Sequence, residues 1–192
     1  MKKSKDFYKS DAITLAKNLI GKVLVHVTDE GITKGIIVET EAYIGKVDDA
    51  AHSFKKSKKR TAIMYESGGY VYMYLSYGIH FNFNITCNHK NITESVLIRA
   101  LEPFNGIELM KKRRNIQDIN KLCNGPGNLS KSMGFSLKDY GKDLTTDEIY
   151  IEDKINNPTI VKSKRIGLNK NKKSKNKLWR FYLKNNKYVS KK

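Results

Sequence analysis

The sequence is poor in the features that mark secreted, membrane-spanning and zinc-binding proteins. Its 192 residues include only two cysteines, Cys87 and Cys123, which form no C-x-x-C pair and no local four-ligand zinc site. No stretch approaches the roughly 20 consecutive apolar residues that a membrane-spanning helix requires. The basic start at residues 1–6 is followed by no apolar segment, so no secretory signal is indicated. We therefore expect a reducing cytoplasmic location and no membrane partner.

Nucleotide-cofactor and serine-hydrolase motifs are also absent. The chain has no G-x-x-x-x-G-K-[ST], no G-x-G-x-x-G and no G-x-S-x-G. No period of about 20 to 50 residues repeats, which argues against a solenoid. The length of 192 residues and the 39% hydrophobic content predict one globular domain, residues 1–192, with a substantial core.

Acidic residues are scarce. The chain has 19 Asp and Glu against 37 Lys and Arg, and its formal net charge is +18. A field of this sign suits a polyanion such as nucleic acid. However, only six of the 37 basic residues are arginine, and lysine is abundant together with Asn and Ile, so part of the charge can reflect A+T-rich codons. The basic runs at residues 55–60 and 162–177 either bind phosphates along a nucleic-acid backbone or form solvated loops.

What is present predicts an α+β fold with mainly antiparallel strands, because the expected strands follow one another through short turns. Residues 10–21 carry apolar side chains at helical spacing between a capping Ser10 or Asp11 and a terminal Gly21. Helices are expected at residues 10–21, 107–114 and 128–133, and strands at residues 22–27, 34–43, 70–75, 79–85, 95–101 and 180–183, the last in a closing hairpin with residues 188–190.

Two groups of side chains could line a functional site. Glu39, Glu41 and Tyr43 share one face of a strand, and this face is too polar for a core, so it is either solvated or part of a site. A run of tyrosines begins at residue 70, and such a stripe is more often core than binding platform. Tyr77 lies at the predicted hairpin turn, where an exposed ring suits insertion between bases. The loop residue His52 is, taken alone, typical of a solvated histidine.

Several segments in order resemble the alkyladenine (3-methyladenine) DNA glycosylase family. The matching stretches are IVETEAY (37–43), AAHS (50–53), YMYLSYG (72–78), NI (84–85), LIRALEP (97–103), LCNGP (122–126), RIG (165–167) and RFY (180–182). Any one of them is a weak signal, but their order and spacing hold over nearly the whole chain. The resemblance implies a single domain with a curved, mainly antiparallel sheet, peripheral helices and a protruding β-hairpin. It also implies a monomer that needs no cofactor and no metal.

The implied activity is monofunctional base excision. The enzyme would flip an alkylated or deaminated purine out of duplex DNA and hydrolyse the N-glycosidic bond, leaving an abasic site in bacterial nucleoid DNA. The resemblance makes Glu41 the general base, with Arg99 and the backbone carbonyl of Ile166 holding the attacking water. Loss of the base develops positive charge on the sugar, which an ionised carboxylate stabilises.

The resemblance also assigns the base-binding residues. Tyr43, His52 and Tyr74 would sandwich the flipped base, and Tyr77 would replace it in the stack. Asn84 would form the pocket floor and crowd the exocyclic amino group of guanine. Electron-rich rings suit purines that carry a delocalised positive charge, such as 3-methyladenine and 7-methylguanine.

Two other interpretations stay open at this point. A non-catalytic basic protein that binds RNA or DNA would share the charge and the tyrosines, but it would leave Glu41 and Arg99 without a task. A bifunctional glycosylase and lyase would need a lysine nucleophile, and no lysine occurs in the matched pocket motifs.

Overall fold

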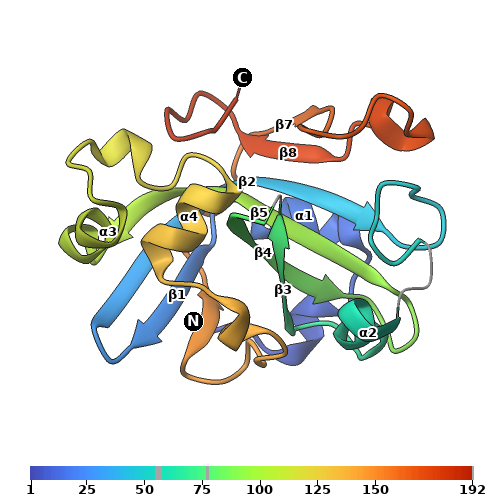
Figure 1. The fold of residues 1–192 in the computed structure, drawn as a ribbon, viewed down its shortest axis with the longest axis horizontal. Helices are drawn as coiled ribbons and strands as arrows, with labels where there is room; N and C mark the ends of the chain where they lie inside the picture. The colour runs from blue at the N-terminus through green and yellow to red at the C-terminus, as the bar shows by residue number, and fades with distance from the viewer. Residues whose placement is uncertain (55–57, 77, 192) are drawn as a thin grey trace.

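The computed structural model describes residues 1–54, 58–76 and 78–191 (Figure 1). Within these residues, eight strands form one antiparallel sheet. The strands are β1 (Val23–Thr28), β2 (Gly31–Ile44), β3 (Val71–Ser76), β4 (His80–Cys87), β5 (Glu94–Asn105), β6 (Ile149–Glu152), β7 (Ile160–Ser163) and β8 (Arg180–Leu183). The α-helices are α1 (Ala12–Leu19), α2 (Lys58–Thr61), α3 (Ile107–Arg114) and α4 (Pro126–Met133). This architecture confirms the predicted α+β class.

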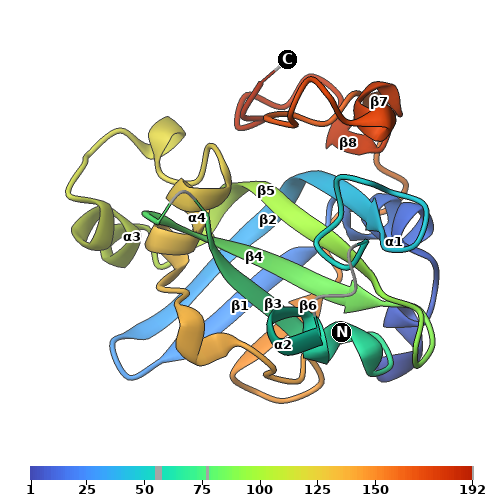
Figure 2. The ribbon, with the colours of Figure 1, turned by 45° about the vertical axis from the view of Figure 1, so that its right-hand side comes forward.

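The long strand β2 organises the sheet, whose order is β3-β4-β5-β2-β1-β6. One edge of β2 pairs with β5 along most of its length. The other edge is shared, because β1 pairs with residues 31–36 and β8 pairs with residues 39–41. Strand β7 then pairs with β8, and Figures 1 and 2 show these two late strands together beside β2. The C-terminal part of the chain therefore borders the same end of β2 that carries the glutamates.

Helix α1 forms where its sequence pattern predicts. Asp11 caps it by accepting hydrogen bonds from the backbone N–H groups of Ile13 and Thr14. Its apolar face is buried in the main core cluster with residues of β2, β4 and β5. A left-handed Gly21, at φ +81°, ends the segment and turns the chain into β1. Cys87 and Cys123 are free thiols within this core cluster.

The structure corrects two details of the predicted elements. Helix α4 begins at Pro126, not at Asn128, because a proline at the first position of a helix needs no hydrogen-bond partner for its nitrogen. The predicted closing hairpin of residues 180–183 with 188–190 is wrong. Strand β8 pairs with β7 and β2 instead, and residues 188–190 form no strand, although Val189 is buried against a second apolar cluster.

The β3–β4 connection carries the predicted wedge. Ser76 of β3 faces His80 of β4 in an antiparallel pair, so a tight turn joins the two strands. The predicted wedge, Tyr77, is outside the described residues, and the protruding hairpin stays a prediction. In the part of the chain that the structure describes, no helix has the length and hydrophobicity to span a membrane. Nor do the described His, Cys, Asp and Glu side chains form a group of three or more that could hold a metal ion.

Candidate active site

A pocket of about 460 Å³ lies among strands β2 to β5, the loop after β2, the turn before α4 and the segment at residues 166–168. This volume falls within the range of small-ligand sites. Six residues predicted for the site line it: Tyr43, His52, Tyr74, Asn84, Arg99 and Ile166. The structure thus brings together residues from six separate segments of the sequence.

Glu41 is fully buried behind the pocket lining, and both of its carboxylate oxygens are held. The backbone N–H of Ile166 donates to Oε1 at 2.7 Å, and the Tyr43 hydroxyl donates to Oε2 at 2.8 Å. The guanidinium of Arg99 places Nη1 3.3 Å from Oε1. Charge-assisted hydrogen bonds of this kind fix a carboxylate in one orientation. The expected pairing of Glu41 with Arg99 is present, whereas Ile166 contributes its N–H to Glu41, and a role for its carbonyl stays a prediction.

A β-bulge places Arg99 next to Glu41. Glu39 of β2 faces Ala100 of β5, and the next residue, Thr40, faces Ile98. Arg99 is therefore an extra residue with no opposite partner, and bulges of this kind redirect a side chain. A regular ladder would give Arg99 a partner on β2 and a different direction.

Glu39 lies two residues before Glu41 on β2 and belongs to the same buried charge group. Its Oε1 lies 2.6 Å from Nη1 of Arg180 and 3.4 Å from Nε of Arg99. Two carboxylates and two guanidinium groups thus alternate in the order Arg180, Glu39, Arg99, Glu41, and their charges balance. Burial of such groups is tolerated only when each charge has a partner.

The histidine and tyrosine rings form a wall of the pocket. The His52 ring meets the Tyr74 ring edge-on, with centroids 4.4 Å apart and planes at 79°. Its Nδ1 shares a hydrogen bond of 2.8 Å with the Tyr72 hydroxyl. Burial, with a smaller contribution from Arg60, lowers the pKa of His52 to about 4, and burial raises the pKa of Tyr72. Both groups are therefore neutral near pH 7.

Tyr43 is supported from outside the pocket. The guanidinium carbon of Arg165 lies 4.6 Å from its ring centroid, so a cation covers one face of the ring. Burial raises the pKa of Tyr43 well above its ordinary value, and its phenol stays a hydrogen-bond donor to Glu41. The ring also lines the pocket, where it can contact a ligand.

Asn84 presents an acceptor. Its Nδ2 donates to the backbone carbonyls of Tyr72 and Asn82, each at 3.1 Å. Because both amide hydrogens are used, Oδ1 is the atom left for a ligand in the pocket.

Sequence reasoning did not assign several of the lining residues to the pocket, among them Tyr72, Asn82 and residues 125–128. Tyr72 and Asn82 line the pocket, and Asn82 donates to the Tyr74 hydroxyl at 3.0 Å. The tyrosine stripe contained the signal for Tyr72, but it also fits a core strand, and Tyr72 is indeed almost fully buried. Residues 125–128 are predicted to form a turn, with Asn128 as a helix cap, yet they line the pocket as well. Only the long-range arrangement of the strands reveals these roles.

Comparisons with known proteins identify the family of the chain. Residues 6–187 match the model of the family described as "Methylpurine-DNA glycosylase (MPG)". A relative from Clostridium novyi (strain NT), named "Putative 3-methyladenine DNA glycosylase", is 46% identical over 198 residues, which cover 98% of each chain. A relative of the same name from Bacillus subtilis (strain 168) is 41% identical over 185 residues, covering 96% of this chain and 94% of its own. The chain therefore belongs to the methylpurine-DNA glycosylase family of DNA repair enzymes.

Proposed function

We propose that this protein is a monofunctional, monomeric glycosylase of base excision repair that removes damaged purines from duplex DNA. The proposed substrates are alkylated and deaminated purines of the 3-methyladenine, 7-methylguanine and hypoxanthine class. The observation that carries the proposal is Glu41, a buried carboxylate beside Arg99 and directly behind an aromatic pocket. A non-catalytic binding protein would have no use for a carboxylate held in this way.

Base flipping gives the pocket its substrate. An atom inside a duplex is out of reach of an enzyme, so the damaged nucleotide must rotate out, at a cost of a few kcal/mol that is smallest for damaged pairs. In the proposal, the base enters between Tyr43 on one side and the pair His52 and Tyr74 on the other. The edge-on contact between His52 and Tyr74 supports their assignment to the same wall. Tyr77, outside the described residues, would fill the gap left in the duplex.

The chemical step needs one carboxylate for a cationic leaving group. As the N-glycosidic bond breaks, positive charge develops on the sugar, and the Glu41 carboxylate stabilises it and accepts a proton from the attacking water. The water oxygen bonds to the anomeric carbon, and the base leaves with the bonding electron pair. A base that already carries a positive charge leaves as a neutral molecule and needs no proton. The Ile166 carbonyl would orient the water.

Asn84 would set part of the specificity. Its two hydrogen bonds to backbone carbonyls hold the side chain in one orientation, where it can crowd an additional group on the base. We propose that this position disfavours normal guanine through its exocyclic amino group.

The decisive test is base release by the Glu41→Gln variant. The amide keeps the size of the side chain but removes the negative charge and the proton acceptor, so we expect single-turnover release to fall about 10²- to 10⁴-fold while lesion binding is retained. Glu102→Gln, a change of the same kind on β5 outside the pocket lining, serves as the matched control.

Two outcomes would contradict the proposal. Near-normal release by Glu41→Gln would remove Glu41 from the mechanism. No release of free base by the unaltered protein from duplexes containing 3-methyladenine or hypoxanthine would favour the non-catalytic alternative. Borohydride trapping of a covalent DNA adduct would instead indicate a lyase with a lysine nucleophile.

A further inference from the structure

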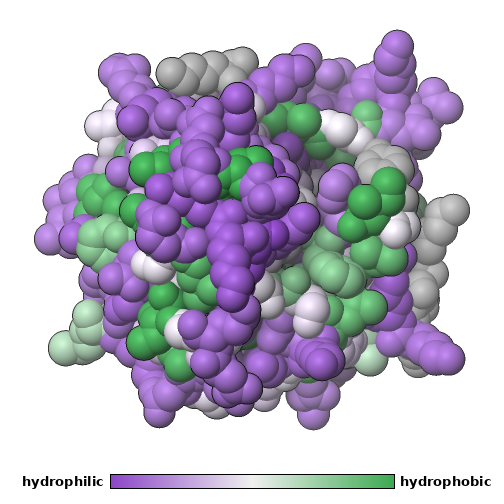
Figure 3. Space-filling view, turned by 60° about the vertical axis from the view of Figure 1, so that its left-hand side comes forward, coloured by the Kyte–Doolittle hydropathy of each residue, from purple (hydrophilic) through white to green (hydrophobic). Residues whose placement is uncertain are grey.

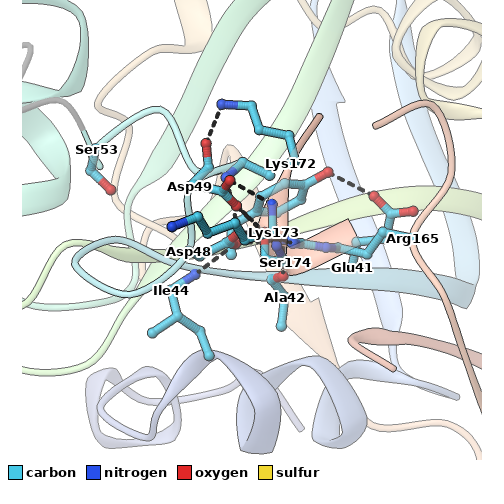
Figure 4. A network of polar contacts seen from close by, with 12 residues as sticks. Glu41, Ala42, Ile44, Asp48, Asp49, Ser53, Arg165, Lys172, Lys173 and Ser174 are labelled. Atoms are coloured by element: carbon cyan, nitrogen blue, oxygen red, sulfur yellow. Dashed lines mark hydrogen bonds and ion pairs between the residues drawn. The ribbon is translucent and has the colours of Figure 1, made fainter. Parts of the chain in front are cut away.

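A second buried ion pair, between Asp48 and Arg165, lies next to the pocket and is not explained by the chemistry above (Figure 4). Both side chains are completely buried. Arg165 donates from Nη1 to Oδ2 at 2.5 Å and from Nη2 to Oδ1 at 2.8 Å, which is the two-point geometry that arginine makes with carboxylates. Desolvation offsets much of the attraction in such a pair, so stability alone is a weak reason for its presence.

Arg165 contacts the two residues that follow Glu41 on β2. Its Nη1 also donates to the backbone carbonyl of Ala42 at 3.0 Å, and Ala42 directly follows Glu41. Its guanidinium carbon lies 4.6 Å from the Tyr43 ring centroid and 5.0 Å from that of Trp179. The guanidinium thus lies against two aromatic rings while its edge binds β2.

These contacts control both hydrogen-bond donors of Glu41. One donor is the hydroxyl of Tyr43, whose ring lies against the Arg165 guanidinium. The other is the backbone N–H of Ile166, the residue that directly follows Arg165 in the chain. A displacement of Arg165 would therefore move two of the groups that hold the carboxylate, while Arg99 is the third.

Asp48 in turn joins the loop after β2 to residues 172–174. Its oxygens accept hydrogen bonds from the backbone N–H groups of Ile44, at 3.3 Å, and Ala50, at 3.1 Å. The Ser174 hydroxyl donates to Asp48 at 2.6 Å. The neighbouring Asp49 accepts from the backbone N–H of Lys173 at 2.7 Å and also contacts Ser174. The same loop continues to His52 in the pocket wall.

We propose that Asp48, Arg165 and Ser174 form a positioning clamp for Glu41. In this inference, which rests on the proposed function, Arg165 is a positioning residue that holds Tyr43 and Ile166 so that Glu41 points at the attacking water. The clamp does not touch the substrate. Its effect depends on geometry as well as charge, because lysine cannot make the two-point bond or lie flat against the rings.

The experiment compares Arg165→Gln, Arg165→Lys, Asp48→Asn and Ser174→Ala by single-turnover base release at saturating enzyme. Parallel measurements give the melting temperature and the affinity for duplex DNA with an abasic-site analogue, which has no base to stack on Tyr43. The matched control is Asp139→Asn. Asp139 is also buried and ion-paired, with Lys142 at 3.0 Å, but it does not line the pocket.

We expect the two Arg165 variants and Asp48→Asn to release the base about 10- to 100-fold more slowly, because small displacements of reacting groups cost rates of this order. Their affinity for the abasic-site duplex should change by less than about threefold. Arg165→Lys should stay slow, whereas a purely electrostatic role would be rescued by lysine. Ser174→Ala removes one hydroxyl and keeps the ion pair, and we expect about two- to fivefold slower release from it.

Normal release by any folded variant at Arg165 or Asp48 would overturn the clamp. If those variants fail to fold, normal release by Ser174→Ala overturns it, and slowed release at an unchanged melting temperature supports it. An equal loss of rate in Asp139→Asn would also overturn it, since the effect would then follow from any buried charge. Failure of the unaltered protein to release bases would refute the proposed function itself.

Discussion

At the scale of single residues, burial decides the protonation state of the pocket. His52 has a pKa of about 4, mainly because burial disfavours its charged form, and an ordinary unfolded histidine has a pKa near 6.5. A neutral His52 can share a hydrogen bond with the Tyr72 hydroxyl without adding a positive charge beside Arg60. A cationic purine would then meet no repulsion from the His52 ring.

This shift predicts how stability depends on pH. The folded pKa of His52 lies below the unfolded one, so between pH 6.5 and about 4 the unfolded state binds more protons, and stability falls as the pH falls through this window. We expect the melting temperature of the unaltered protein to drop several degrees more between pH 7 and pH 5 than that of His52→Gln. The buried His26, whose pKa is also lowered, contributes to both proteins and cancels in the comparison. If the melting temperatures of the two proteins fell equally with pH, the assignment of this effect to His52 would be contradicted.

The family resemblance named candidate residues for the pocket, but little of their geometry could be predicted from the sequence. Glu41 and Tyr43 were placed on one strand face by the two-residue period of a strand, and they do contact each other. The approach of Arg99 depends on a bulge, which arises from the pairing of β2 with β5 and leaves no mark in the local sequence. The same holds for Asp48 and Arg165, which are 117 positions apart.

At the scale of elements, the position of strand β8 depends on its contacts with β2, β7 and the core. It has only four residues, Arg180–Leu183, and it occupies the edge of β2 beyond the end of β1. Phe181 anchors it, because its ring is almost fully buried in the main core cluster. The strand also brings Arg180 to Glu39, so its attachment supports the buried charge group.

Phe181→Ala tests this attachment. Removing a buried phenylalanine ring costs about 3 to 5 kcal/mol, which corresponds to a fall of roughly 10 °C in melting temperature for a chain of this size. Thermal unfolding measures it directly. Tyr182→Ala, a truncation of the neighbouring, partly exposed ring, is the control, and a smaller effect at Phe181 than at Tyr182 would show that β8 is not anchored in this way.

Local patterns predicted the helices better than the last strands. Helix α3 occupies the predicted residues 107–114, since its ends are marked by left-handed residues at Gly106 and Asn115. Residues 180–183 were correctly expected to be a strand, but their partner was wrong. The turn-like residues 184–187 suggested a hairpin, whereas the buried edge of β2 offers a longer-range pairing that no local pattern encodes.

At the scale of the whole molecule, the net charge of +18 attracts the protein to DNA whatever the DNA sequence. Figure 3 shows hydrophilic side chains over most of one face, with separate hydrophobic patches between them. Only the part of this surface that faces the DNA backbone can release counterions. We therefore expect fewer phosphate contacts than the net charge of +18 would suggest.

The salt dependence of DNA binding tests this view. For about four to six phosphate contacts, affinity for undamaged duplex DNA should fall about 10²- to 10³-fold between 50 and 200 mM salt. A titration by fluorescence anisotropy at several salt concentrations gives the slope. A slope near zero would mean that the basic surface does not meet the backbone, and a much steeper one would mean that DNA wraps around more than one face.

The backbone N–H of Ile166 donates to Glu41 across 125 positions of the sequence, so the two partners are synthesised at different times. A ribosome completes Glu41, the rings of the pocket and Arg99 well before it reaches Ile166. At about 5 to 20 residues per second, roughly 6 to 25 seconds separate the two partners. During that interval the nascent chain carries the Glu41 carboxylate without one of the groups that hold it. Under the proposed function, activity therefore depends on a segment that emerges late, and a product terminated before Ile166 would lack this hydrogen bond to Glu41.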